Sequence, residues 1–256
     1  MQETKVLDKG YVKLTGTLLS EDDDKDCAKA LDDMVVETAR VSYGSGLKGP
    51  EKDKKLLHYL LEHEHGTPFE SAVFRFEIKL PLFCMQQFLR HRWSSFNQIS
   101  GRYTDEIADE FYMPEVLRAQ DVKNKQGSTE AINPGIDLTE NEASSITQCK
   151  TFSIGARNYY QYALESQQAQ YAKLVLSGVA KELARGILGS AFYTKFVWTV
   201  NARSLINFFV LRCDEHAQYE TRLYSWAIFR IVEHKMPWLC EGLLKYFPTS
   251  FVNEPK

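Results

Sequence analysis

Residues 73–80 read VFRFEIKL, and apolar and charged side chains alternate strictly along them. The even-numbered positions are Phe, Phe, Ile and Leu, whereas positions 75, 77 and 79 are Arg, Glu and Lys. Because successive side chains of a strand point to opposite faces, the pattern predicts a half-buried β-strand. Pro81 follows directly and suits the first position of a helix, which we expect to run to Arg90.

Other segments show apolar residues at helical spacing, and two more have the composition of strands. Helices are predicted over residues 27–39, 54–65, 152–176 and 179–188, from 202 onward, and over 216–246 with a break at Pro237. Strands are predicted over 11–19 and 192–200. The polar residues 123–148 lack sustained periodicity and are interpreted as an excursion inside one domain. The expected fold class is therefore α+β, with a small, mostly antiparallel sheet packed with helices.

The composition places the chain among ordinary globular proteins. Of its 256 residues, 44% are hydrophobic and 25% are charged, and the formal net charge is -3. A nucleic-acid-binding domain usually carries a basic balance, so the charge weighs against that class. No run of about 18 apolar residues is present, and the N-terminus lacks an apolar segment behind a basic start. We therefore expect neither a membrane span nor a secretory signal.

Five cysteines are scattered along the chain, and none belongs to a C-x-x-C pair. They are Cys27, Cys84, Cys149, Cys213 and Cys240. Their odd number and their spacing argue against a disulfide framework and against a zinc site. The pattern favours a reducing, cytoplasmic location, with each thiol as a small buried side chain and no bound metal.

Residues 86–103 read QQFLRHRWSSFNQISGRY and combine arginines, a histidine, amides and hydroxyls without any acidic residue. Arginine forks match phosphate oxygens two at a time, and Ser hydroxyls and backbone amides satisfy the remaining lone pairs. Mixed donors with aromatic residues between them predict a shaped pocket for a phosphorylated small molecule, at the end of a helix and in the loop after it. The alternative for Arg90 alone is a cation beside the last carbonyls of a helix.

A second set of polar residues lies in an otherwise apolar segment. It consists of Asn201, Arg203, Asn207 and Arg212, and two of these, Arg203 and Asn207, share one face of the predicted helix. Buried polar side chains need partners, so the set forms a ligand site, an internal hydrogen-bond network, or an ion pair with Asp214 or Glu215.

Residues 65–70, HGTPFE, end one predicted helix and lead into the strand at 73. A cation at a helix end explains His65 as well as a catalytic role does. There is no G-x-G-x-x-G, Walker loop, H-E-x-x-H or nucleophile elbow in the sequence. Phosphate binding must therefore rest on arginine side chains instead of a Gly-rich helix N-terminus.

The arginine-rich segment contains Arg-His-Arg, seven residues and then Ser (RHRWSSFNQIS), which resembles the signature of the flavin-dependent thymidylate synthases. Three more segments resemble that family in the same order: ARVSYG at 39–44, HGTPFE at 65–70 and YTKFVWTVNARSLINFFVLRCDEHAQYE at 193–220. The resemblance extends from near the N-terminus to Phe247. It implies the family's fold in a single domain over residues 1–256, with a variable insertion at 119–148.

This resemblance implies a methyltransferase that makes dTMP from dUMP. In such enzymes 5,10-methylenetetrahydrofolate supplies the carbon, NADPH reduces bound FAD, and the reduced flavin delivers the hydride. The subunits form a homotetramer in which each active site draws on more than one subunit. We accordingly expect small-molecule partners, without nucleic acid or membrane.

The resemblance also implies roles for individual residues. FAD would be held by Ser42, Thr67, Arg90, His91, Arg92, Gln98, Asn201, Arg203 and Asn207. The nucleotide dUMP would be held by Gln87, Arg90, Gln98, Ser100, Gly101, Arg102, Arg185 and Arg212. The implied catalytic residues are Arg212, which would set the ionisation of the uracil, and His65, which would lie beside flavin and folate. Arg suits the first role better than Lys because it stays protonated when buried.

Two positions depart from the family's pattern. Gln98 stands where many relatives carry Glu, so an amide replaces a charge beside nucleotide and flavin. Residues 186–190, GILGS, replace the Leu-Pro often found after the arginine that matches Arg185, which leaves the backbone there open.

Two alternative hypotheses remain from the sequence. One is an FAD-binding NADPH oxidase or reductase that lacks methyl transfer. The other is a nucleic-acid-binding module, which would bind in a salt-dependent manner and carry no flavin.

Overall fold

The computed structural model describes residues 3–18, 29–139 and 153–255, and the chain forms two compact units. Unit 1 consists of Met1–Leu80, Cys84–Gln98 and Lys195–Lys256, and unit 2 consists of Pro81–Phe83 and Ile99–Thr194. Whether the two units fold as the single domain expected from the sequence stays a prediction. None of the helices in the described ranges is long and apolar enough to cross a membrane.

A five-stranded sheet forms the centre of unit 1, in the order β1-β2-β3-β9-β4. Its strands are β1 (Glu3–Val6), β2 (Gly10–Thr17), β3 (Val73–Pro81), β9 (Tyr193–Asn201) and β4 (Ser94–Gln98). The pairs β1–β2, β2–β3 and β4–β9 are antiparallel. All four even-numbered apolar positions of β3 are fully buried. The strands predicted over 11–19, 73–80 and 192–200 correspond to β2, β3 and β9, although β2 ends at Thr17 and residue 19 lies outside the described residues. The α+β class with a mostly antiparallel sheet is confirmed.

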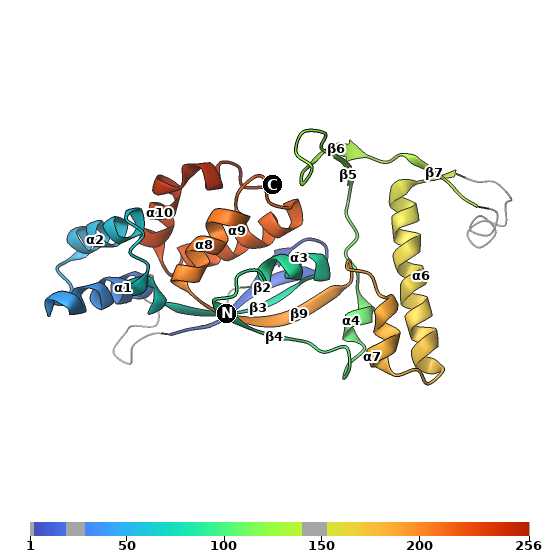
Figure 1. Ribbon diagram of the computed structural model, residues 1–256, viewed down its shortest axis with the longest axis horizontal. Helices are drawn as coiled ribbons and strands as arrows, with labels where there is room; N and C mark the ends of the chain where they lie inside the picture. Colours follow the sequence, from blue (N-terminus) through green and yellow to red (C-terminus); the bar gives the residue numbers. More distant parts are fainter. Residues whose placement is uncertain (1–2, 19–28, 140–152, 256) are drawn as a thin grey trace. The chain divides into compact units, whose positions relative to one another are not determined.

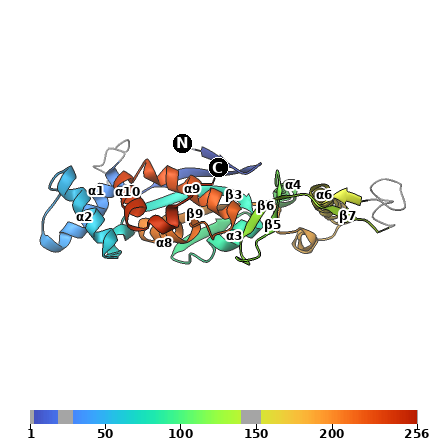
Figure 2. The same ribbon diagram turned by 90° about the horizontal axis from the view of Figure 1, so that it is seen from above.

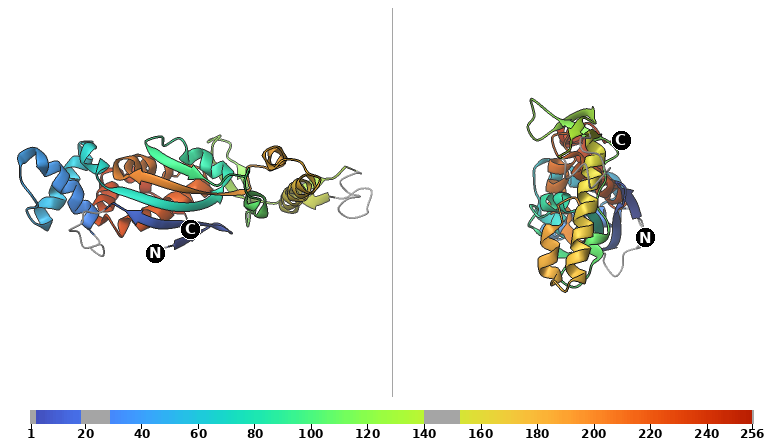
Figure 3. Two further views of the ribbon diagram at one scale, coloured as in Figure 1. Left: turned by 90° about the horizontal axis from the view of Figure 1, so that it is seen from below. Right: turned by 90° about the vertical axis from the view of Figure 1, so that its right-hand side faces the viewer.

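Helices cover one face of this sheet. They include α8 (Ala202–Arg212), α9 (Tyr219–Glu233) and α10 (Pro237–Tyr246), which lie over the strands in Figures 1 and 2. Seen from below in Figure 3, the strands lie in front of these helices. At one end of the sheet α2 (Pro50–Glu62) contacts α1 (Ala30–Arg40) and α10. The predicted break at Pro237 is confirmed, since α10 begins there.

An aromatic cluster joins β9, α8 and α3 (Leu82–Phe88). The ring of Phe88 lies 4.8 Å from that of Phe208 and 5.4 Å from that of Trp198, measured between centroids. All three side chains are fully buried, and such aromatic contacts, edge-to-face for Phe88 and Trp198, add to the free energy of burial. The indole N–H of Trp198 donates to Ser94 Oγ at 2.8 Å, so its polar group is satisfied. This cluster fixes residues 89–93, the segment that carries Arg90, His91 and Arg92.

Two buried carboxylates tie the helical end of unit 1 together. Asp32 of α1 accepts hydrogen bonds from the backbone N–H groups of Trp238 and Leu239, in the first turn of α10. These donors have no partner within their own helix, so the carboxylate caps α10 from another element. Asp53 of α2 pairs with the buried guanidinium of Arg40, and it also accepts from the backbone N–H of Gly49 at 2.9 Å.

Unit 2 is built around the long helix α6 (Ala156–Leu176), which Figure 3 shows beside a shorter helix. Its other elements are α4 (Glu106–Asp109), α7 (Lys181–Ala184), η3 (Arg185–Ile187) and the two-stranded sheets β5 (Leu117–Gln120) with β6 (Ser128–Ile132) and β7 (Gly135–Asp137) with β8 (Ser153–Gly155). Tyr171 of α6 packs with Ala108 and Ala184 in a small core.

Several element boundaries differ from the sequence prediction. Pro81 is the last residue of β3 instead of the first of a helix, and α3 ends at Phe88 before Arg90. The loop expected after α3 contains β4, whose Phe96 stacks on Trp198 of the neighbouring strand. The helix expected over 179–188 shrinks to α7 and η3. These differences arise because partners distant in sequence decide the local structure.

The predicted insertion at 119–148 is more ordered than its sequence indicates, as far as residue 139. It contains β6 and β7, and Asp121 Oδ1 accepts from the backbone N–H groups of Lys123 and Asn124 in the turn before β6. Every residue of β6 is exposed, so no apolar alternation marked it as a strand. Residues 140–148 of this segment, the first two positions of the helix expected over 27–39, and Cys27 and Cys149 lie outside the described residues.

Candidate functional site

A cavity of about 360 Å³ in unit 1 gathers most of the residues expected to hold FAD. Its lining is rich in arginine and asparagine, with one carboxylate. The lining residues are Glu70, Arg90, His91, Arg92, Trp93, Asn201, Arg203, Ser204 and Asn207. They come from η2 (Thr67–Glu70), from the segment between α3 and β4, and from the start of α8. Three segments far apart in sequence thus form one cationic cavity.

The start of α8 is fixed by its own cap and by the neighbouring segment. Asn201 is the N-cap residue, and its side-chain oxygen accepts from the backbone N–H of Ser204 at 2.9 Å. The hydroxyl of Ser204 donates to the backbone carbonyl of Trp93 at 2.8 Å. Arg203 and Asn207 follow on one face of the helix, as predicted, and both line the cavity.

The HGTPFE segment (residues 65–70) contacts the side chain of Arg203. A Cβ atom at Gly66 would lie 2.7 Å from Nε of Arg203 and 3.1 Å from its Cδ, so the arginine stem needs the space that glycine leaves. The guanidinium then forms an ion pair with Glu70, four residues further along. Glu70 was not among the predicted site residues, because nothing local in the sequence pairs it with Arg203.

A buried imidazole connects the cavity to Arg212. Nε of Arg212 donates to Nε2 of His91 at 3.3 Å, which requires a neutral imidazole with its proton on Nδ1. Burial, reinforced by the charge of Arg212, lowers the pKa of His91 to about 4. The Nδ1 atom is buried without a hydrogen-bond partner in the described residues. His91 therefore offers one unused donor.

Burial also lowers the pKa of Arg212, and the nearby charge of Arg90 adds to the effect. A second side chain contacts this guanidinium, since Nη1 donates to Oε1 of Gln87 at 3.3 Å. Gln87 in turn donates through Nε2 to Oε1 of Gln218. The structure thus joins His91, Gln87 and Arg212 in one hydrogen-bond network, one of the alternatives expected from the sequence, and the partners of Arg212 in it are His91 and Gln87.

A second group of predicted site residues lies in unit 2. A Cβ atom at Gly101 would lie 2.1 Å from Cδ1 of Ile107 and 3.3 Å from Cδ of Arg185, so Gly101 allows Arg185 to pack beside the turn. Ser100 closes this turn, because its carbonyl accepts from the backbone N–H of Tyr103 at 3.0 Å. Arg102 is exposed beside it. The helical turn η3 carries Arg185 despite the GILGS departure that follows.

Comparison with known proteins identifies relatives of this chain. The family model described as "Thymidylate synthase complementing protein" matches residues 26–238. The flavin-dependent thymidylate synthase of Thermosipho melanesiensis is 43% identical over 244 residues, which cover 95% of this chain and 94% of that protein. The chain belongs to the flavin-dependent thymidylate synthase family.

Further relatives support the assignment to the flavin-dependent thymidylate synthase family. The flavin-dependent thymidylate synthase of Kosmotoga olearia is 41% identical and covers 97% of this chain, with 96% of its own length matched. A crystal structure of a UMP/dUMP methylase, PolB from Streptomyces cacaoi bound with 5-Br dUMP, superposes with a TM-score of 0.74. The match covers 96% of this chain and 100% of the PolB chain at 24% identity, which shows a shared fold.

The cavity fits the flavin cofactor that the family's name implies. A dinucleotide carries a diphosphate, which three arginines and two asparagines can bind through charge-assisted hydrogen bonds. The orphan Nδ1 donor of His91 lacks an acceptor that a ligand atom would supply. The one lining carboxylate, Glu70, is paired with Arg203 and so does not oppose an anion as a free charge.

The remaining predicted residues lie outside the cavity lining. Ser42 is exposed in η1 (Val41–Tyr43), and Thr67 is exposed at the start of η2. His65 is exposed, with its ring edge-on to Tyr59 at 5.9 Å. Gln98 is exposed at the end of β4. The roles of these four residues, like those of the other predicted site residues, stay predictions.

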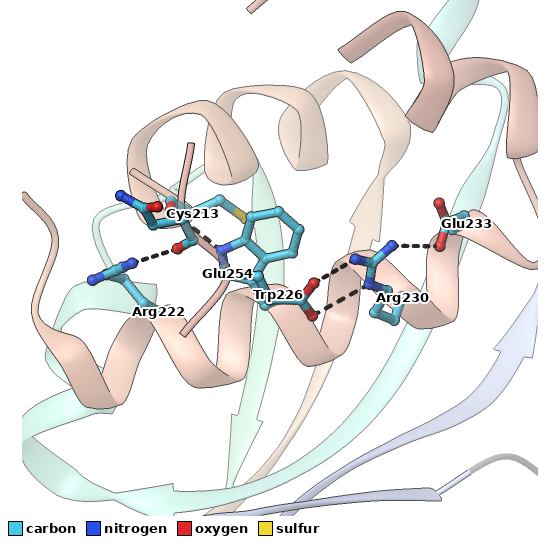
Figure 4. Close-up of polar contacts among 7 residues, drawn as sticks. Cys213, Arg222, Trp226, Arg230, Glu233 and Glu254 are labelled. Carbon is cyan, nitrogen blue, oxygen red and sulfur yellow. Dashed lines mark hydrogen bonds and ion pairs between the residues drawn. The ribbon is translucent and has the colours of Figure 1, made fainter. Parts of the chain in front are cut away.

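The C-terminal end of α8, next to Arg212, is held by α9. Figure 4 shows the indole of Trp226, whose N–H donates to the carbonyl of Cys213 at 3.3 Å. On the same helix Arg230 forms ion pairs with Glu254 and Glu233, and Arg222 donates to the backbone carbonyl of Asn253. These contacts tie Asn253 and Glu254, near the end of the chain, to α9, the helix that holds the backbone beside Arg212.

The described cysteines are buried and unpaired. Burial raises the pKa of Cys213 to about 12 and also raises those of Cys84 and Cys240. The thiols are therefore protonated at neutral pH and are poor nucleophiles. Across the described ranges no group of His, Cys, Asp and Glu side chains is placed to hold a metal ion.

Proposed function

We propose that this protein converts dUMP to dTMP, with 5,10-methylenetetrahydrofolate as the carbon donor. Bound FAD, once reduced by NADPH, supplies the hydride. The observation that carries the proposal is the position of His91, which lines the arginine-rich cavity and also accepts a hydrogen bond from Arg212. The cavity expected to hold the flavin and the arginine expected to activate the uracil are therefore directly connected.

The cavity residues hold and orient the flavin. We assign the diphosphate to Arg90, Arg92 and Arg203, whose guanidinium groups offer paired N–H donors. Asn201 and Asn207 add neutral donors, and His91 adds its Nδ1–H. Because His91 stays neutral at physiological pH, its Nδ1–H donates a hydrogen bond to the ligand without adding a charge beside Arg212.

Arg212 stabilises charge on the nucleotide. Activating the uracil ring builds negative charge on its carbonyl–imide edge, and a fixed guanidinium in a partly desolvated site stabilises that charge. A guanidinium remains protonated even where burial lowers its pKa. A cysteine nucleophile is not part of this scheme, which agrees with the protonated state of the described thiols.

The phosphate of dUMP is assigned to Ser100, Arg102 and Arg185 of unit 2. Arg185 and Gly101 pack together, and Arg102 is exposed beside them. Two guanidinium groups and a hydroxyl supply the donors that a dianionic phosphate requires.

We further propose that the protein is a homotetramer whose active sites draw on more than one subunit. In the single chain Trp93 of the cavity rim is 87% exposed and Tyr103, beside Arg102, is 80% exposed. Exposed aromatic side chains beside binding residues support burial by another subunit. Light scattering of the purified protein would give the mass of four chains. A cytoplasmic location, supported by the unpaired buried thiols, is also part of the proposal.

The test is product formation by the purified protein with FAD, NADPH, methylenetetrahydrofolate and dUMP. We expect dTMP by chromatography, loss of product when any one component is omitted, and loss with Arg212→Ala. A protein that binds FAD and oxidises NADPH but forms no dTMP would be a reductase instead. A colourless protein that cannot be loaded with FAD and binds DNA would overturn the enzyme assignment altogether.

A further inference from the structure

The amide of Gln87 bridges two side chains, and its orientation is dictated by chemistry. A guanidinium has donors and no acceptor, so Gln87 must turn its oxygen toward Nη1 of Arg212. Its NH₂ group then faces Gln218, whose side-chain oxygen must accept the hydrogen bond. In the structure Nε2 of Gln87 donates to Oε1 of Gln218 at 2.5 Å. With no acceptor at position 218, the Gln87 amide loses the contact that keeps its oxygen toward Arg212.

This orientation matters because Arg212 is held by two acceptors. Nε donates to the neutral His91 and Nη1 donates to Gln87, both at 3.3 Å. Nη2 makes no hydrogen bond to any described residue, so it is the nitrogen available for a substrate. Both contacts are long, and a flipped Gln87 amide would place its NH₂ donors against the guanidinium.

One helix sets the position of Gln218 relative to Arg212. Gln218 is the N-cap residue of α9, where its side chain makes no capping hydrogen bond. Two turns further along the same helix, Trp226 binds the carbonyl of Cys213, the residue after Arg212 (Figure 4). A single rigid element therefore anchors both the backbone beside Arg212 and the acceptor that orients Gln87.

We propose that Gln218 is a positioning residue for Arg212 that acts through the amide of Gln87. Gln218 itself forms no hydrogen bond with Arg212 or with His91, the two side chains expected to meet the uracil and the flavin. The proposal rests on the proposed function, in which Arg212 stabilises the ionised uracil imide.

Two variants separate the orienting role from simple packing. Gln218→Leu keeps the approximate size of the side chain and removes the acceptor, whereas Gln218→Glu keeps an acceptor oxygen toward Gln87. Gln86→Leu changes the exposed neighbouring amide and serves as the matched control. The readout is the pKa of the imide of bound dUMP, followed by ultraviolet difference spectra against pH, together with kcat against pH.

For the wild type we expect binding to lower the imide pKa below that of free dUMP. Gln218→Leu should raise the bound pKa by about one unit and lower kcat about tenfold at neutral pH, since one hydrogen bond to a charged group loses its orientation. The kcat deficit should shrink at alkaline pH, where the imide ionises unaided. Gln86→Leu should match the wild type, Gln218→Glu should stay closer to the wild type than Gln218→Leu, and FAD affinity should be unchanged in all three.

An unchanged imide pKa in Gln218→Leu, with dUMP bound, would overturn the positioning role and leave the proposed function intact. A double variant Gln87→Leu/Gln218→Leu should lose no more than Gln87→Leu alone, because both changes break one link. Additive losses would contradict the relay. If wild-type protein bound dUMP without lowering the imide pKa, or did not bind it, the proposed function and this inference would both fail.

Discussion

Replacing Gly66 by Ala should weaken flavin binding without destabilising the fold. The added Cβ would lie 2.7, 3.1 and 3.3 Å from Nε, Cδ and Cγ of Arg203, closer than ordinary contact, which begins at 3.4 Å. The arginine stem must move away, and its guanidinium then leaves both Glu70 and the cavity. The backbone at Gly66 is helical, with φ -73° and ψ -26°, so alanine fits the local conformation.

The magnitude follows from the contact that is lost. One charge-assisted hydrogen bond contributes about 1.5–3 kcal/mol, so the dissociation constant for FAD should rise about 10- to 150-fold. The stability change should be small for two reasons. An exposed ion pair such as Arg203–Glu70 is worth about 0–1 kcal/mol, and a compatible Gly-to-Ala change stabilises by about 0.4–1 kcal/mol through the unfolded state.

The assay is titration of the apoprotein with FAD, followed by quenching of flavin fluorescence, with urea unfolding of the same samples. Gly46→Ala is the control, because a Cβ there meets no atom within 4 Å. Arg203→Ala reports the full loss of the guanidinium. Wild-type FAD affinity in Gly66→Ala, with weak binding in Arg203→Ala, would refute the claim that Gly66 positions Arg203. Wild-type affinity in both would remove Arg203 from the flavin site.

Four further outcomes follow from other residues. Asp53→Ala strands the buried guanidinium of Arg40 and should lower the free energy of unfolding by about 3–5 kcal/mol in urea titration; a loss below about 1 kcal/mol would contradict this. Burial raises the pKa of Asp32 from 3.8 to about 7. As the pH rises, the unfolded chain therefore loses this proton at a lower pH than the folded chain, and the free energy of unfolding falls between about pH 4 and pH 7. Asp32→Asn cannot ionise and should gain up to about 4 kcal/mol relative to the wild type across that window; a constant difference would argue against it. Cys213→Ala should keep turnover, since the pKa of this thiol is about 12, and lost turnover with FAD and dUMP still bound would show that the thiol is required. Gln98→Glu should bind dUMP in titration, because the position is exposed at a strand end; collapse of dUMP affinity would count against that.

Local patterns in the sequence predicted the elements whose surroundings are uniform. The alternation along β3 and the apolar run of α8 each report burial on one side, and both elements form where expected. Strand β4 was missed because Ser, Asn and Gln dominate it, and Phe96 alone shows that it packs on Trp198. Strand β6 was also missed, because all its residues are exposed and its sequence therefore shows no apolar alternation.

The candidate site was predictable in its residue types but not in its contacts. The cluster of arginines at 90–92 and the one-face spacing of Arg203 and Asn207 are local features, and these residues line one cavity. By contrast, Gly66 beside Arg203 and Gly101 beside Arg185 depend on close approaches between distant segments. Gln218 was missed for the same reason, since only the fold brings its amide to Gln87.

The most direct test of the central claim is an anaerobic single turnover of the FAD-loaded protein after reduction by one equivalent of NADPH. We expect that adding dUMP and methylenetetrahydrofolate together reoxidises the flavin and yields about one dTMP for each flavin oxidised. Either compound alone should leave the flavin reduced. Flavin that stays reduced with both present, or reoxidation without dTMP, would show that this protein does not methylate dUMP in the proposed way.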